Sequence, residues 1–86
     1  MGNHKKILDL VMDGFEVNYK LLYISKVKVG SESTEHIQVH CDRYDIEYSK
    51  LFKLENAQFA VSKFLHLKLQ YNISEYKHLE ENHGIS

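Results

Sequence analysis

The sequence predicts an α+β fold in the order α-β-β-β-α: a three-stranded antiparallel meander with two helices on one face and a short C-terminal helix. Two observations predict it. Apolar and polar residues alternate from Phe15 to Val29 and again from Ile37 onward, as they do in strands with one buried face. This alternation changes phase once, at Asp42-Arg43, which is what a tight hairpin requires.

A helix is expected from about Asn3 to Asp13, before the first strand. Asn3 is a suitable N-cap residue, and Gly14 follows where a C′ glycine would end the helix. Four apolar residues line one side of this helix: Ile7, Leu8, Leu10 and Val11. The first strand should then cover residues 15–29 with its odd-numbered apolar residues inward. Its length predicts a bend or bulge near Leu22–Ser25.

The second strand carries its apolar residues at odd positions too. Pairs between the first two strands should therefore have residue numbers that sum to an even value. A two-residue turn at Asp42-Arg43 then makes each inward pair of the following hairpin apolar: Cys41 with Tyr44, Val39 with Ile46, and Ile37 with Tyr48.

The C-terminal third predicts two helices. Residues 54–70 carry apolar side chains at three-four spacing. Asn72 and Glu75 form a capping box, which predicts a short helix over residues 73–81. The last residues, 82–86, are expected to fray, and residues 1–86 are expected to form a single domain.

Composition restricts the classes of function. A formal net charge of −1 gives no strong field toward nucleic acid or membranes. Cys41 is the only cysteine, so no disulfide or cysteine cluster forms within the chain, and a lone thiol is typical of a reducing compartment. No apolar run approaches the ~20 residues of a membrane span. We expect a cytoplasmic protein that does not enter membranes.

No residue pattern predicts catalysis, a metal site or a cofactor. His36 and His40 share one face of a strand, but four strand residues separate them by about 13 Å, too far for one zinc ion. His40 and the adjacent Cys41 point to opposite faces and cannot act together. No glycine-rich loop follows a strand to bind phosphate. We expect a protein that is not an enzyme.

The outward sheet face is the first candidate site, because it gathers residues that could bind an anion: Lys20, Lys26, Lys28, His36, His40 and Arg43. In this interpretation Glu16, Asp45 and Glu47 lie on the same face. A solvated face of mixed charge is therefore the simpler alternative.

An apolar pair on that same face is the second candidate site. Leu22 and Ile24 interrupt the polar pattern and need cover. With Tyr71 and Tyr76 nearby, they are expected to form a surface for self-association or for a protein partner. The alternative is that the third predicted helix covers both residues.

Two resemblances bear on function. The α-β-β-β-α order is similar to that of the double-stranded RNA-binding domain, whose lysine-rich second helix and Gly/His loop contact RNA. The corresponding stretches here are Lys53–Ala60, with one lysine, and Gly30–His36. In composition, the last third around residues 54–68 resembles small uncharacterised phage and prophage proteins of Gram-positive bacteria. This second resemblance implies a regulator or an inhibitor of host defence.

The sequence therefore favours a non-catalytic protein-interaction module, of the kind that phages or mobile elements encode as regulators or inhibitors. It would bind a protein partner or a second copy of itself, with no cofactor. The alternative is a nucleic-acid-binding domain that uses the Lys/His/Arg face of the sheet.

Overall fold

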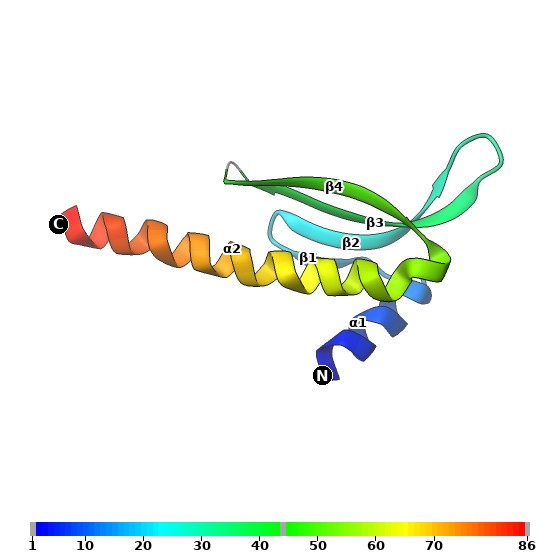
Figure 1. The fold of residues 1–86 in the computed structure, drawn as a ribbon, viewed down its shortest axis with the longest axis horizontal. Coiled ribbons are helices and arrows are strands. Elements are labelled where there is room, and N and C mark those ends of the chain that lie inside the picture. Colours follow the sequence, from blue (N-terminus) through cyan, green and yellow to red (C-terminus); the bar gives the residue numbers. More distant parts are fainter. Residues whose placement is uncertain (1, 44, 86) are drawn as a thin grey trace.

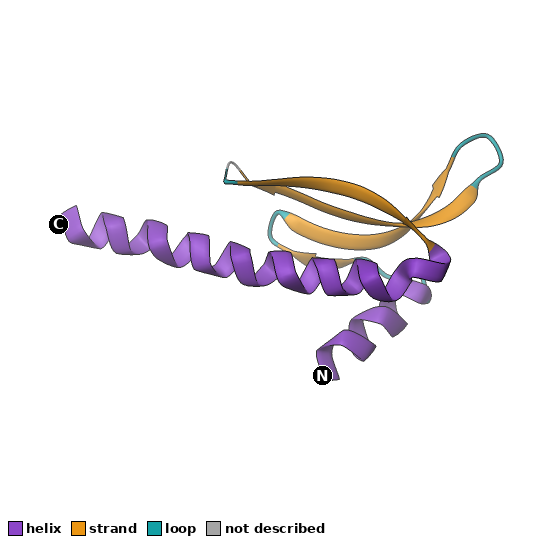
Figure 2. Cartoon of the chain, in the orientation of Figure 1, coloured by secondary structure: helices purple, strands orange, loops and turns teal. Residues whose placement is uncertain are grey.

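The structure, a computed structural model, describes residues 2–43 and 45–85, with side chains described for residues 3–43 and 45–73. The elements follow in the order α1 (Gly2–Met12), β1 (Val17–Tyr19), β2 (Leu22–Val29), β3 (Thr34–Arg43), β4 (Ile46–Lys53), η1 (Leu54–Asn56, a 3-10 turn) and α2 (Ala57–Ile85). The strands form one antiparallel meander in the order β1-β2-β3-β4, with α1 and α2 on the same side (Figure 1, Figure 2). The predicted α+β class is confirmed, with four strands in place of three.

Both helices and the inner face of the sheet share one core. Its buried side chains are Val11, Leu22, Ile24, Ile37, Val39, Cys41, Ile46, Ala57, Ala60, Val61, Phe64, Leu67 and Tyr71. In α2 the buried positions recur every three or four residues, as in a helix with one face packed on a sheet. The opposite sheet face, the open face, is not covered by α1 or α2. It carries the odd-numbered residues of β2 and β4 and the even-numbered residues of β3.

The end of α1 follows the prediction. Gly14 has a φ of +96°, and its amide donates a hydrogen bond to the Val11 carbonyl (3.0 Å). The Phe15 amide donates to the Leu10 carbonyl (2.9 Å). Together these two bonds make a Schellman motif, whose left-handed residue is usually glycine.

A tight turn divides the stretch that was expected to form one long strand. Lys20 has a φ of +56°, and β1 pairs with β2 across this turn, Tyr19 lying opposite Leu22. The turn changes the phase of the alternation. Val17 and Tyr19 pack against the core before it, and Leu22 and Ile24 are buried in the core after it. The prediction that odd-numbered residues point inward throughout 15–29 is therefore wrong.

The register between β2 and β3 follows from this change of phase. Leu22 lies opposite Cys41 and Ile24 opposite Val39, so the paired numbers sum to an odd value. The predicted even sum is wrong. Only the odd sum places the buried residues of the two strands on the same face.

The β3–β4 hairpin turns two residues later than predicted. Cys41 lies opposite Tyr48, whereas the predicted register paired it with Tyr44, a residue outside the described ones. The sum of the paired residue numbers changes by four. Because this change is even, each residue stays on the side of the sheet that was predicted. The predicted pairs are therefore wrong in register, but the shared burial of Val39 and Ile46 is confirmed.

One helix takes the place of the two predicted near the C-terminus. α2 continues from Ala57 to Ile85, so neither the break near residue 72 nor fraying over 82–85 is observed, and Ser86 lies outside the described residues. Asn72, the predicted N-cap, instead accepts a hydrogen bond from the Tyr19 hydroxyl. A helix of this length spans about 43 Å, and its C-terminal part extends beyond the sheet (Figure 1).

Candidate interaction surface

The predicted apolar contact surface is part of the core. Leu22 and Ile24 are 0% exposed and Tyr71 is 2% exposed. All three belong to the cluster between the sheet and the helices. Tyr76 lies outside the described side chains. The prediction of an exposed surface here is wrong, because the turn at Lys20 directs the even-numbered β2 residues toward the helices.

The predicted basic face is divided between the two sides of the sheet. Lys26, Lys28 and Arg43 lie on the helix side, His36 and His40 lie on the open face, and Lys20 lies in the β1–β2 turn. These six residues do not form one anion-binding face. The sequence interpretation failed because it assigned the wrong phase to β2 and placed Arg43 in a turn.

Two of these cations hold elements of the fold together. Lys26 Nζ donates to the carbonyl of the last α1 residue (3.0 Å) and lies 3.6 Å from a Glu35 carboxylate oxygen. The guanidinium carbon of Arg43 lies 4.1 Å from the centre of the Tyr71 ring, and its Nε donates to Asp45 Oδ1 (3.1 Å). Hydrogen bonds to Tyr71 and Asp45 raise the pKa of Arg43 above its ordinary value. This side chain therefore links the β3–β4 hairpin to α2.

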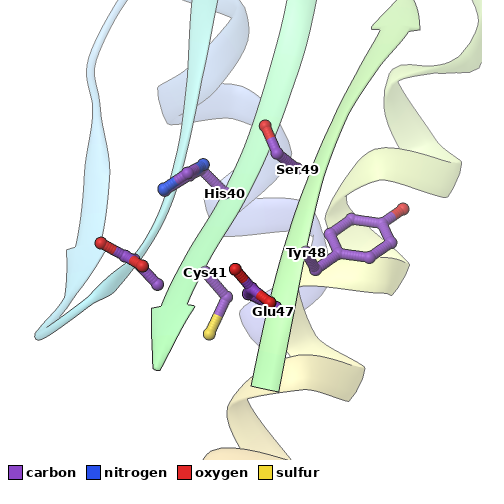
Figure 3. A pocket seen from close by; sticks show the side chains of 6 residues that line it. His40, Cys41, Glu47, Tyr48 and Ser49 are labelled. Carbon is purple, nitrogen blue, oxygen red and sulfur yellow. The ribbon is translucent and has the colours of Figure 1, made fainter. Parts of the chain in front are cut away.

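The β3–β4 hairpin contains a shallow hollow. Its volume is about 350 Å³, and it is lined by His40, Cys41, Asp42, Glu47, Tyr48 and Ser49 (Figure 3). His40 lies opposite Ser49, and its ring centre is 5.3 Å from that of Tyr23 on β2. Tyr48 points to the helix side, where Lys63 Nζ is 4.8 Å from the centre of its ring (Figure 3).

The thiol and the imidazole that line this hollow are not placed to act together. Burial raises the pKa of the Cys41 thiol above its ordinary value, so the thiol is protonated near neutral pH. Cys41 also faces the core, whereas His40 faces the open side. Within the described side chains, no group of three His, Cys, Asp or Glu residues is placed to hold a metal ion.

The two edges of the sheet differ in length, since β1 has three residues and β4 has eight. The Asp42 amide donates to the Leu21 carbonyl (3.0 Å), so even-numbered β3 residues direct their backbone groups toward β2. Odd-numbered β3 residues therefore bond to the even-numbered β4 residues opposite them. The amides directed away from the sheet are those of Glu47, Ser49, Leu51 and Lys53. The outward carbonyls are those of Glu47, Ser49 and Leu51, because Lys53 is the N-cap of η1 and its carbonyl accepts the first bond of that turn.

Apolar side chains flank this edge. Leu51, on the open face, is 43% exposed, and Phe59, near the start of α2, is 57% exposed. Both line a hollow of about 510 Å³ together with Lys50, Phe52, Lys53, Glu55 and Asn56. We call the outward backbone groups of residues 47, 49, 51 and 53, with the side chains of Leu51 and Phe59, the β4 edge surface.

Sequence reasoning missed this surface because its hairpin register ended the last strand near Tyr48. One signal was present. Phe52 is in phase with the even-numbered Ile46 and Tyr48, with Lys50 between them, and this spacing indicates a strand four residues longer. A longer strand places Leu51 on the open face at an edge.

Exposed large apolar side chains are also found elsewhere: Leu69 and Ile73 on α2, and Met12, Phe15 and Leu21 near β1. No helix in the described part of the chain is long and apolar enough to cross a membrane. Comparisons of the chain with protein-family models, with curated proteins and with solved structures find no match.

Proposed function

We propose that this protein is a non-catalytic interaction module that binds an extended segment of a partner protein along the β4 edge surface. The observation that carries the proposal is the row of outward backbone groups on an eight-residue edge strand. Such an edge is a template for another strand, and proteins usually shield it with charged side chains, proline, bulges or covering segments. Of these features, β4 carries exposed charges at Glu47, Lys50 and Lys53. β4 has no proline, and it pairs with β3 without a bulge from Ile46 to Lys53.

Strand addition gives this surface a source of both affinity and selectivity. Each hydrogen bond to the edge contributes about 0.5–1.5 kcal/mol net, whatever the sequence of the partner. Leu51 and Phe59 supply selectivity because a partner with apolar side chains at matching positions covers them. Covering the exposed half of a Phe side chain contributes about 1 kcal/mol.

We place this activity in the cytoplasm. The unbridged thiol of Cys41 supports a reducing compartment. The compositional resemblance of the last third to phage and prophage proteins supports the role of a regulator or inhibitor, which acts by occupying a strand-binding site on its target.

The nucleic-acid alternative has less support. Its six cations or histidines are divided between two faces, and Lys26 and Arg43 already bind groups of the fold. It stays a prediction, which a gel shift at low salt tests. Binding that weakens steeply with added salt would favour it over the strand-addition proposal.

The proposed function is tested by capture from cells of the source organism. Three tagged proteins are compared: the wild type, the double variant Leu51→Asp/Phe59→Ser, and the control Leu69→Ser, which removes a more exposed apolar side chain from α2. We expect wild type and control to retain the same partner protein and the double variant to lose it, with equal circular dichroism spectra. Equal retention by all three proteins would contradict binding at this edge.

A further inference from the structure

We propose that the occupant of the β4 edge surface is a second copy of this chain, paired antiparallel through β4 about a two-fold axis at Lys50. The two four-stranded sheets then become one continuous sheet of eight strands. This inference rests on the proposed strand-addition function, and it names the partner.

Symmetry and the hydrogen-bond pattern restrict the register of such a pair. The groups that can bond across the edge belong to odd-numbered residues, so odd must pair with odd and the paired numbers sum to an even value. A sum of 100 pairs all of the outward residues with one another. Glu47 lies opposite Lys53 of the second copy, and Ser49 lies opposite Leu51. A sum of 98 would place Lys53 opposite Asp45, beyond the end of β4.

Charge complementarity supports the register with a sum of 100. Glu47 and Lys53 are both exposed on the open face, and the two-fold axis places one such pair at each end of the joint. Opposite charges directly across a strand pair are favourable, and like charges are unfavourable. On the open face, the edge is therefore complementary to itself.

The helix side is compatible with the same register. Tyr48 of each copy lies opposite Phe52 of the other, so the two-fold axis creates two aromatic pairs. Aromatic pairs are among the most favourable cross-strand neighbours. Lys50 meets Lys50 of the second copy at the axis. This like-charge contact is solvent-exposed, and Lys50 Nζ already lies 5.1 Å from the centre of its own Phe52 ring.

Sedimentation equilibrium of the purified full chain over a range of concentrations tests the pairing, with charge reversal as the specific probe. We expect a monomer–dimer equilibrium in the wild type. Glu47→Lys and Lys53→Glu should each weaken dimerisation by about tenfold or more, because two ion pairs become two like-charge pairs. The double variant Glu47→Lys/Lys53→Glu should restore the wild-type dissociation constant to within about threefold.

A backbone probe with a matched control completes the experiment. Ser49→Pro removes an amide at the free edge and leaves the β3–β4 bonds intact, so we expect a folded monomer. Lys50→Pro removes an amide that bonds to β3, so we expect loss of the native circular dichroism spectrum. These opposite results from adjacent residues confirm which backbone groups face outward.

The outcomes that overturn the inference differ from those that overturn the proposed function. A wild-type chain that stays monomeric at every concentration refutes self-pairing. Capture of a different protein that is lost in Leu51→Asp/Phe59→Ser would then still support strand addition at the β4 edge surface. A dimer that is insensitive to Ser49→Pro refutes the edge as its interface. A dimer that Glu47→Lys weakens but the double variant fails to restore refutes the register.

Discussion

Truncation of Ile24 to alanine measures which side of β2 is buried. Ile24 is 0% exposed, although alternation over residues 15–29 predicts that it points outward. Ile24→Ala removes three carbons, which lowers stability by about 2.4 kcal/mol through lost apolar burial. The cavity left behind adds to this, for a total loss of about 3–4 kcal/mol. In a chain of this size the melting temperature should fall by about 12 °C or more.

Val27→Ala is the matched control, because Val27 lies on the open face of the same strand and is half-buried. It removes two carbons from a partly solvated site, so the expected loss is below about 1 kcal/mol. Urea unfolding followed by circular dichroism measures both variants. If Val27→Ala costs as much as Ile24→Ala, the described phase of β2 is wrong, and with it the burial of Leu22 and Ile24.

Three further predictions concern stability. Gly14→Ala should lower it by about 1 kcal/mol in urea unfolding, because φ is +96° and the new methyl group meets no neighbouring atom within 4 Å. Arg43→Ala should lower it by about 1–2 kcal/mol through lost contacts with Tyr71 and Asp45, and Arg43→Lys should recover less than half of that loss. Burial raises the pKa of Cys41 above its unfolded value, so stability should hold below about pH 8 and fall as the pH rises above that range. Cys41→Val, measured by unfolding at neutral and at alkaline pH, should reduce this alkaline loss.

The sequence is sufficient to predict the fold class because burial restricts side-chain direction more strongly than turn position. Val39 and Ile46 share the core although the hairpin turns two residues later than expected. Moving a two-residue turn by two positions changes every pair and leaves every side chain on its original face. The alternation of apolar and polar residues therefore predicts on which face of the sheet a side chain lies, but it does not predict which residues pair across the strands.

The first strand shows where this reasoning fails. Its odd-numbered apolar series continues through Tyr19, Leu21 and Tyr23, and the only sign of the turn is that Leu22 and Ile24 interrupt the polar series. The turn depends on Lys20 at φ +56°, a conformation that favours glycine or asparagine. A lysine at this position gives no sequence signal for a turn. The packing of Leu22 and Ile24 against α2 is a long-range effect, and a pattern read along one segment does not contain it.

The candidate site was missed for a related reason. Sequence patterns indicate sites through unusual side chains, whereas the β4 edge surface consists mainly of backbone groups, which every residue carries. Their direction depends on the register of two neighbouring strand pairs, fixed here by the Asp42–Leu21 hydrogen bond and by the position of Tyr48 opposite Cys41. An error of one residue in either register would exchange the outward and inward sets.

The same residues that stabilise β4 also create its free edge. Phe52 packs against the core and lies opposite Ile37, which extends the strand well past Tyr48. That extension adds Leu51 and Lys53 to the outward backbone groups. Shortening the strand would therefore remove core contacts and binding groups together, and loss of binding would then prove nothing about the edge. Within β4, fold and interaction can be separated at odd-numbered positions, where the backbone faces solvent and the side chain lies on the open face. Substitutions at residues 47, 49, 51 and 53 are consequently the informative ones within this strand.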